Sequence, residues 1–284
     1  MTTTSPPAEI DIARAKAVAL AAALRDAGRV LVAFSGGVDS AYLACVAVDT
    51  LGASNVLAVI GTSASYPAEQ WAAARDVAER IGLSVVEVRT DELADPNYVA
   101  NPVNRCYFCK TELWTRLAPI AREHRFDVIV DGTNADEVSD YRPGAAAARE
   151  HGVRSPLADA GLTKREIRIL SRARGLPTWA QPSSPCLSSR IPYGTPVTST
   201  RLHQIEAAER ALRSLGIGGD LRVRHHGDVA RVELARDELP RWLDDAALAE
   251  LTRAVRAAGF ARVALDLRGF RSGSLNILEG IVAA

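Results

Sequence analysis

One stretch decides the fold of this chain: Val30-Leu31-Val32-Ala33-Phe34-Ser35-Gly36-Gly37-Val38-Asp39-Ser40. An apolar run rich in β-forming residues ends at Ser-Gly-Gly, and a helical pattern of apolar residues begins directly after it. The pattern predicts a buried strand, a tight glycine turn and the first turn of a helix. Without Cβ atoms, Gly36 and Gly37 let backbone N–H groups converge on an anion at the positive end of that helix. Ser35 and Ser40 add hydroxyl donors, and Asp39 can bind first-turn amides or help to hold a magnesium ion.

The loop lacks the lysine that follows the glycines in nucleoside-triphosphate loops of the Gly-Lys-Ser/Thr type. It resembles, residue for residue, the SGGxDS pyrophosphate loop (PP-loop) of the ATP-pyrophosphatase superfamily. The resemblance implies that the loop grips the pyrophosphate released when ATP is split between its α and β phosphates, so that an adenylated substrate forms. An ordinary glycine turn between a strand and a helix is the alternative. The predicted ATP-binding residues are Ala33, Ser35, Gly36, Gly37, Val38, Asp39, Ser40, Thr62 and Gly132, and Asp39 is also assigned a catalytic role.

Composition indicates a soluble globular protein and bears on its partners. The chain has 284 residues, of which 48% are hydrophobic and 24% charged, and its length predicts about two domains. The 34 basic residues balance 34 acidic ones, which argues mildly against nucleic acid, whose phosphates require a basic face. No apolar run approaches the ~20 residues that span a membrane, and residues 1–11 lack the basic flank of a signal peptide. We therefore expect a cytoplasmic protein that acts on a small molecule, with no nucleic acid or membrane as partner.

Strand and helix patterns alternate along the first part of the chain. Helical patterns cover residues 10–27, 67–81, 111–124 and 163–174, and further strand patterns cover 55–60, 84–88 and 127–130. This alternation predicts an α/β fold with a parallel, doubly wound sheet, whose ligands bind at the carboxyl ends of the strands. Residues 60–63 follow one strand at the expected height of the adenosine. Residues 131–137 and 140–144 follow another and supply carboxylates for the nucleotide and its magnesium, although polar turns and helix caps would look the same.

The composition shifts to Pro, Ser and Gln at residues 176–185, which indicates a domain boundary. Beyond it the patterns predict a helix over 200–215, a hairpin of strands 221–226 and 229–234 across Gly227-Asp228, a helix over 246–258 and a strand over 262–267. We therefore predict two domains. Residues 1–178 form the ATP-pyrophosphatase domain, and residues 179–284 form a smaller α+β domain.

Three of the four cysteines are candidates for chemistry. Cys106 and Cys109 form a CxxC pair at the mouth of a predicted helix, where the helix's positive end and flanking basic residues favour thiolates. Cys186 lies in a proline-bounded polar loop near the predicted domain junction. Three thiolates without an obvious fourth ligand are unusual for structural zinc, so an iron–sulfur cluster with one open iron is slightly favoured over zinc or a redox dithiol. Cys45 lies on the apolar face of the helix after the glycine loop and is read as inert packing.

Taken together, the motifs resemble those of the LarE-type sulfur transferases, over most of the chain from Arg29 to Asn276. The residues that carry the resemblance are the glycine loop, Asp131-Gly132-Thr133-Asn134, Asp140-Tyr141-Arg142-Pro143-Gly144, Cys186-Leu187-Ser188-Ser189-Arg190-Ile191-Pro192-Tyr193-Gly194, Arg222-Val223-Arg224-His225 and Gly269-Phe270-Arg271-Ser272-Gly273. The resemblance implies maturation of the nickel-pincer cofactor of lactate racemase. A carboxylate of pyridinium-3,5-biscarboxylic acid mononucleotide is adenylated and then converted to a thiocarboxylate. It also implies a homo-oligomer, a hexamer in the family.

The family has two versions, and the resemblance assigns roles accordingly. In one version a single cysteine, matching Cys186, gives up its own sulfur. In the other, cysteines matching Cys106, Cys109 and Cys186 hold a [4Fe-4S] cluster whose open iron can carry a transferable sulfide, and this sequence resembles the second. Cys186 is thus both a metal ligand and a catalytic residue. Arg222, Arg224 and Arg271 are expected to hold the carboxylates and phosphate of the substrate through bidentate bonds, with Glu233 as a supporting member.

Other functions remain open from the residues alone. A thiolase acting on tRNA or on another small molecule would use the same adenylation and CxxC pair. An ammonia-using ligase is a weaker alternative because it needs no such cysteines. A nucleotide-binding regulatory protein with a structural zinc is the alternative of a different class. The expected cofactors are ATP, Mg²⁺ and the [4Fe-4S] cluster.

Overall fold

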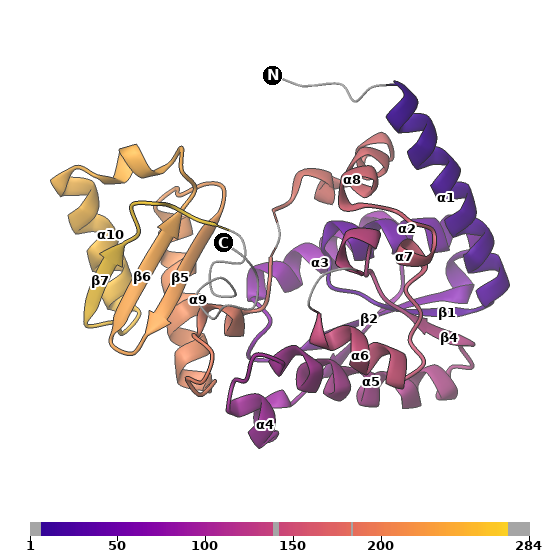
Figure 1. Ribbon diagram of the computed structural model, residues 1–284, viewed down its shortest axis with the longest axis horizontal. Coiled ribbons are helices and arrows are strands. Elements are labelled where there is room, and N and C mark those ends of the chain that lie inside the picture. The colour runs from indigo at the N-terminus through magenta and orange to yellow at the C-terminus, as the bar shows by residue number, and fades with distance from the viewer. Residues whose placement is uncertain (1–6, 139–141, 183, 272–284) are drawn as a thin grey trace. The chain divides into compact units, whose positions relative to one another are not determined.

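A computed structural model describes residues 7–138, 142–182 and 184–271 of the chain. The chain divides into two compact units. Unit 1 comprises Met1–Glu92 and Asn104–Ser184, and unit 2 comprises Leu93–Val103 and Pro185–Ala284. This division assigns residues 93–103 and 179–184 differently from the predicted limits 1–178 and 179–284. Figure 1 follows the chain by colour from α1 in unit 1 to β7 in unit 2.

Unit 1 is built on a parallel sheet of four strands in the order β3-β2-β1-β4. The strands are β1 (Val30–Ala33), β2 (Val56–Thr62), β3 (Val85–Arg89) and β4 (Val128–Val130). In register, Val30 of β1 lies opposite Val56 of β2 and Val128 of β4. The predicted α/β fold with a parallel sheet is confirmed, and the carboxyl ends of β1, β2 and β4 share one edge.

The helices of unit 1 connect these strands. They are α1 (Pro7–Ala27), α2 (Val38–Leu51), α3 (Ala68–Arg80), α5 (Arg105–Glu123), α6 (Pro143–Glu150), α7 (Pro156–Asp159) and α8 (Lys164–Ala173). Short 3₁₀ turns are η1 (Ala53–Asn55), η2 (Glu92–Ala94), η3 (Ala135–Glu137) and η4 (Pro177–Ala180). Helix α5 begins six residues before the predicted start at 111, so it includes the CxxC pair. The short helices α6 and α7 were not predicted.

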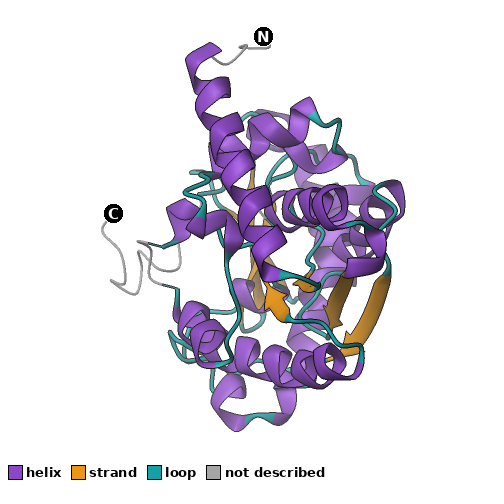
Figure 2. Cartoon of the chain, turned by 90° about the vertical axis from the view of Figure 1, so that its right-hand side faces the viewer, coloured by secondary structure: helices purple, strands orange, loops and turns teal. Residues whose placement is uncertain are grey.

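Alternate residues of the strands enter two separate cores, one on each face of the sheet. Val30 and Val32 belong to a core completed by α1, α2, α3, α7 and α8. Leu31 and Ile129 belong to the other core, with Trp114 of α5 and Ala147 of α6. Figures 1 and 2 show helices on both sides of these strands. Because both faces of the sheet are buried, its strands carry apolar residues at nearly every position and not only at alternate ones.

Unit 2 contains the predicted order of helices and strands. It also includes residues 93–103, which come from between β3 and α5 in the sequence. Its strands β5 (Leu221–His226), β6 (Val229–Leu234) and β7 (Arg262–Leu265) form a sheet in the order β5-β6-β7. Strands β5 and β6 are an antiparallel hairpin that closes at Gly227 (φ +65°), and β7 runs parallel to β6. Its helices and turns are α4 (Pro96–Val99), η5 (Leu187–Arg190), α9 (Ser199–Ser214), η6 (Leu239–Trp242) and α10 (Asp245–Ala257).

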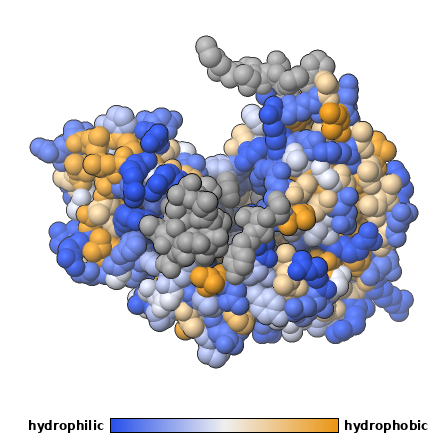
Figure 3. All heavy atoms as spheres, in the orientation of Figure 1, coloured by the Kyte–Doolittle hydropathy of each residue, from blue (hydrophilic) through white to orange (hydrophobic). Residues whose placement is uncertain are grey.

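The face of the molecule drawn in Figure 3 is largely polar. Figure 3 shows hydrophilic residues over much of the visible face of each unit, with apolar residues in smaller patches. None of the helices in the described ranges combines the length and the apolar character needed to cross a membrane.

Candidate functional site

The glycine loop joins β1 to α2, and its shape requires glycine at position 36. Gly36 has a φ of +69°, a conformation that side chains disfavour. A Cβ atom there would lie 2.4 Å from the Cβ of Ala74, because α3 packs directly against the loop. Gly37 is the N-cap residue of α2, and no side chain caps that helix. The first turn of α2 therefore faces the loop with its positive end, which suits an anion.

Hydrogen bonds hold the loop from two sides. The Oγ atoms of Ser35 and Ser40 lie 3.1 Å apart, and the Ser35 N–H donates to Ser40 Oγ at 3.3 Å. The Ser35 carbonyl accepts from the Tyr66 hydroxyl at 3.0 Å and from Gln70 Nε2 at 3.1 Å. Both serine hydroxyls thus sit at the loop, as the sequence predicts, and its backbone is fixed by Tyr66, just before α3, and by Gln70 in the first turn of α3.

Lys164 is a member of this site that sequence reasoning did not select. Its Nζ forms an ion pair with Asp39 Oδ2, and the two side chains are 32% and 16% exposed. Within the described part of the chain, Asp39 Oδ1 is buried and has no hydrogen-bond partner. Lys164 lies 125 residues beyond Asp39, directly after the N-cap residue of α8, so only the fold brings its charge to the loop.

The loop after β4 runs against the first turn of α2. A Cβ atom on Gly132 would lie 2.9 Å from the Ser40 backbone nitrogen, so glycine permits this close approach. The Asp131 carboxylate is held by Thr133 Oγ1 at 2.9 Å and by Ser155 Oγ at 2.8 Å. Gly132 and Ser40, both predicted to bind ATP, are therefore neighbours.

Glu137 of η3 brings a further carboxylate to this region. Burial raises its pKa, and the negative charges of Asp39 and Asp131 add to that effect, while Arg142 and Lys164 oppose it. Among the residues that the structure describes, no group of three or more His, Cys, Asp or Glu side chains is placed to hold a metal. Magnesium on a nucleotide commonly takes only one or two carboxylates, with phosphates and water as its other ligands. Asp140 and Tyr141, quoted for the family motif, lie outside the described residues.

The carboxyl ends of β2 and β3 carry a buried carboxylate. Glu92 accepts hydrogen bonds from Ser63 Oγ at 2.6 Å and from Thr90 Oγ1 at 3.0 Å. The neighbouring Thr62 donates through Oγ1 to the Val88 carbonyl at 3.3 Å. Because β1 and β2 are parallel, Thr62 lies at the same sheet edge as Ala33. This edge is where the adenosine is expected.

In unit 2 the structure gathers three of the four predicted substrate-binding residues. Arg222 and Arg224 lie on the same face of β5, and both are buried. Arg224 Nε donates to Glu233 Oε2 at 3.0 Å. Burial and then the charge of Arg190 lower the pKa of Arg222 to about 10. Arg271 is exposed at the end of the described residues.

The three candidate thiols are distributed over both units. Cys106 is exposed and Cys109 partly exposed near the start of α5 in unit 1, three residues apart and so on one side of the helix. Cys186 is partly exposed in unit 2, where it is the N-cap residue of η5. Cys45 differs, because burial raises the pKa of its thiol, as expected for an inert packed cysteine.

Comparisons with known proteins identify the family. The chain is 39% identical to the pyridinium-3,5-bisthiocarboxylic acid mononucleotide synthase of Lactiplantibacillus plantarum, over 92% of this chain and 94% of that protein. The chain belongs to the LarE-type sulfur transferases. It is also 45% identical to an uncharacterised protein of Synechocystis sp., over 87% of this chain and 92% of the other. Residues 15–99 of this LarE-type chain match the NAD synthase family, so the match covers the glycine loop.

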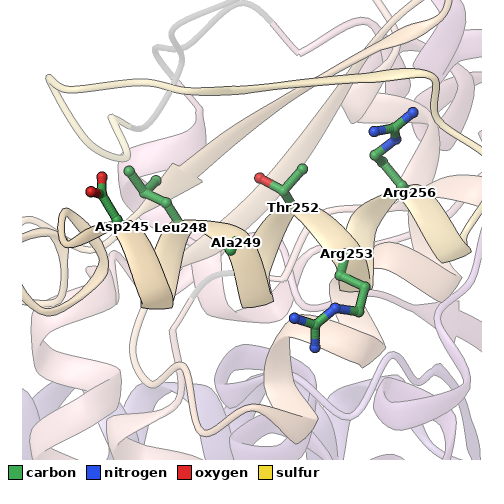
Figure 4. A pocket seen from close by; sticks show the side chains of 6 residues that line it. All are labelled: Asp245, Leu248, Ala249, Thr252, Arg253 and Arg256. Atoms are coloured by element: carbon green, nitrogen blue, oxygen red, sulfur yellow. The ribbon is translucent and has the colours of Figure 1, made fainter.

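One hollow on the LarE-type chain is lined by none of these residues. It has a volume of about 630 Å³ and lies on α10, where Figure 4 shows side chains of that one helix around it. The lining residues are Asp245, Leu248, Ala249, Thr252, Arg253 and Arg256. None of the residues predicted to bind ATP, substrate or metal is among them. We assign it no part in the chemistry.

Proposed function

We propose that the chain is an ATP-dependent sulfur transferase of nickel-pincer cofactor synthesis. It adenylates a carboxylate of a pyridinium biscarboxylate mononucleotide, releases pyrophosphate, and converts the adenylate to a thiocarboxylate with release of AMP. The observation that carries the proposal is that one chain has both a glycine loop at the uncapped N-terminus of α2 in unit 1 and a partly exposed thiol on a hydrogen-bonded loop in unit 2. The name of the L. plantarum relative, which describes a bisthiocarboxylic acid mononucleotide, supports the substrate class.

The glycine loop is assigned to the pyrophosphate of ATP. Backbone N–H groups at the start of α2 and the hydroxyls of Ser35 and Ser40 donate to phosphate oxygens. Lys164 supplies a positive charge at the same place, where it now neutralises Asp39. Stabilising the charge that develops on the leaving pyrophosphate is the catalytic contribution of these donors.

Asp39 and Glu137 fit a magnesium ion bound with ATP. Among the described residues, Asp39 Oδ1 is buried without a hydrogen-bond partner, so it offers a ligand oxygen. The pKa of Glu137 is raised first by burial and then by Asp39 and Asp131, and a cation bound beside it would lower that pKa. When bound, magnesium withdraws electron density from the phosphates and so aids attack at the α phosphate. The two carboxylates hold and orient it.

The arginines of β5 are assigned to the anionic substrate. The pKa of Arg222 is lowered because its guanidinium is buried and has Arg190 and Arg224 as cationic neighbours. An anion placed there would relieve that repulsion, as the phosphate or a carboxylate of the mononucleotide would. Glu233 orients Arg224, and Arg271 completes the proposed set.

Cys106, Cys109 and Cys186 are the proposed ligands of a [4Fe-4S] cluster. Cys106 is exposed, and Cys109 and Cys186 are partly exposed, so none of the three side chains is shut inside its unit. When bound, the cluster supplies an open iron that can carry the sulfide to be transferred. We further propose, from the family resemblance, that the protein is a cytoplasmic homo-oligomer, a hexamer as in the family.

Anaerobic purification with iron and sulfide analysis and a visible absorption spectrum tests the proposal. We expect about four iron and four sulfide per chain, with strong losses in C106S, C109S and C186S. The matched control is C45S, which changes a cysteine outside the proposed set and should keep its iron. Iron-free protein that transfers one sulfur and converts Cys186 to dehydroalanine would favour the sacrificial version instead. Colourless protein with one zinc and no pyrophosphate release would reject the enzyme.

A further inference from the structure

The segment 185–195, which carries Cys186, is held within unit 2 by buried side chains from a distant part of the sequence. Asn101 Nδ2 donates to the Pro192 carbonyl at 2.7 Å. The hydroxyls of Tyr98 and Ser188 lie 2.6 Å apart. These three side chains are almost completely buried. The segment is therefore an ordered part of unit 2 although much of it has no regular secondary structure.

Arg190 contacts the backbone on both sides of the Cys186 α carbon. Its Nη1 donates to the Pro185 carbonyl at 2.6 Å and to the Cys186 carbonyl at 3.0 Å. The same nitrogen donates to Ser189 Oγ at 3.1 Å. The Arg190 side chain is only 2% exposed. Fixing the carbonyls before and after Cys186 limits rotation of its backbone, and hence the directions in which the thiol can point.

Glu209 of α9 holds Arg190 in place from the opposite side. Arg190 Nε donates to Glu209 Oε1 and Nη2 to Oε2, each at 3.0 Å. This two-point geometry restricts the plane of the guanidinium more tightly than a single contact would. Glu209 Oε1 also accepts from the Val223 backbone N–H at 2.9 Å, which ties the pair to β5.

A second guanidinium strengthens the same connection. Arg224 Nη1 donates to the Ser189 carbonyl at 2.9 Å, while its Nε and Nη2 contact Glu233. The segment with the thiol is thus linked through Arg190 to α9 and through Arg224 to β6. Because a buried guanidinium is costly unless it is paired, loss of either set of contacts should loosen this segment.

We propose that Arg190, oriented by Glu209, is a positioning residue that fixes the direction of the Cys186 thiol. The inference rests on the proposed function for its purpose, because thiol transfer and metal ligation both require a sulfur held in one direction. Arg190 acts through the backbone of Pro185 and Cys186 and takes no part in the bond changes. The partly exposed thiol is the one group of this loop that must meet another reactant.

The test compares R190K with R213K in the full-length chain. Lysine keeps the charge at 190 but cannot span Glu209 and two carbonyls at once. Arg213 is the matched control, because it lies on α9 and also donates to two backbone carbonyls, those of Ile217 and Gly219, at 2.8 and 2.7 Å. Those carbonyls belong to a different loop. E209Q is a second variant that keeps Arg190 and removes the charge that orients it.

Two measurements distinguish positioning from general stability. The first is the alkylation rate of Cys186 by iodoacetamide in reduced, iron-free protein, determined by peptide mass spectrometry against Cys106 of unit 1 in the same sample. We expect R190K to raise that ratio about threefold or more, since a loosened loop exposes the thiol. The second is sulfur transfer, whose kcat should fall about tenfold or more with an unchanged KM, because a misplaced reacting group lowers the rate and not substrate binding.

E209Q, like R190K, should raise the alkylation ratio and lower kcat. R213K should stay within about twofold of the unaltered protein in both measurements. Equal effects of R190K and R213K would overturn the proposal, as would a lowered Tm in R190K without any change in the alkylation ratio. The alkylation result does not depend on activity. If the unaltered protein transfers no sulfur, the proposed function fails while the alkylation ratio still decides whether Arg190 positions the thiol.

Discussion

Gly36 is constrained both by its backbone conformation and by a neighbouring helix. Its positive φ and its contact with α3 are separate reasons for glycine, so G36A should combine two costs. We expect a loss of about 2–4 kcal/mol in the free energy of unfolding, from backbone strain plus displacement of Ala74. Chemical denaturation measures it.

Gly82 is the matched control for that prediction. It has a φ of +64°, and a Cβ atom there would have no neighbour within 4 Å. G82A should therefore cost only the backbone strain, about 1 kcal/mol. Equal losses for G36A and G82A would show that α3 does not constrain the loop.

Glu137 gives a prediction about pH. Because burial and then Asp39 raise its pKa, the folded protein binds the Glu137 proton more tightly than the unfolded chain does. The group's contribution to stability is greatest below its ordinary value of 4.5 and declines as pH rises through the raised pKa of the folded state. E137Q cannot lose a proton, so at pH 7 it should raise the Tm by about 1–3 °C.

The same substitution should weaken magnesium-dependent pyrophosphate release, because a neutral amide is a poor magnesium ligand. Thermal denaturation from pH 4 to pH 8 measures the first effect, and a steady-state assay at several magnesium concentrations measures the second. A variant less stable than the parent at pH 7 but not at pH 4 would show that the carboxylate is stabilising and would contradict the assignment.

The residues that sequence reasoning found here and the one it missed differ for a physical reason. Ser35, Gly36 and Asp39 lie close together in the sequence, in the glycine loop and the first turn of α2, so their proximity in the fold follows from the sequence alone. Lys164 reaches Asp39 only because α8 packs against α2 in the same core. Its residue type gave no signal, since a lysine in the first helical turn is commonly a solvated charge.

Among the elements, α8 depends on a capping box that also binds a distant helix. Thr163 and Glu166 cap each other's backbone N–H groups, and Lys16 of α1 donates to both Glu166 oxygens at 2.7 and 2.8 Å. Burial alone would raise the pKa of Glu166, but hydrogen bonds from Lys16 and Thr163 outweigh it and lower the pKa. E166Q should cost about 1–3 kcal/mol at pH 7.

The loss of stability caused by E166Q should disappear as the pH falls. A lowered pKa means that the stabilisation is present above the ordinary value of 4.5 and is lost as pH falls through the folded-state pKa. Denaturation curves for E166Q and the parent should therefore converge in acid. D76N is the control, since the Arg80–Asp76 pair is more than half exposed on each side and should change stability by less than about 0.5 kcal/mol. If E166Q lowers the free energy of unfolding equally at every pH, the loss is caused by altered packing and not by the missing charge.

The short helices could not be predicted from the periodicity of apolar residues. Helices α4, α6 and α7 have 4, 8 and 4 residues, too few for a helical period to appear. Each begins with proline, which is the signal that was available. The hairpin of β5 and β6 is the opposite case, because Gly227-Asp228 fixes its turn and the strand register follows.

At the scale of the whole molecule, sequence order conceals which segments belong together. Residues 93–103 lie between β3 and α5 of unit 1 but form part of unit 2. Tyr98 and Asn101 contact residues about 90 positions later in the chain. No local pattern predicts such an insertion, because its cause is a set of buried polar contacts and not a periodic apolar face.

The division into two units predicts that adenylation and sulfur transfer can be separated by substitutions in the intact chain. The residues proposed to bind ATP and magnesium lie in unit 1, whereas Cys186 lies in unit 2. Adenylation forms an acyl–phosphate bond and releases pyrophosphate without any thiol. C186S should therefore retain substrate-dependent pyrophosphate release, within about threefold, and lose thiocarboxylate formation altogether, because its hydroxyl cannot supply sulfur.

D39N should behave in the opposite way. It removes the charge that pairs with Lys164 and that is proposed to bind magnesium, so pyrophosphate release should fall about a hundredfold or more and thiocarboxylate formation with it. Both products are measured in one anaerobic reaction, by a coupled pyrophosphate assay and by mass spectrometry. Loss of pyrophosphate release in C186S, with the fold intact by circular dichroism, would mean that the thiol acts before or during adenylation. The order of steps would then have to be reversed.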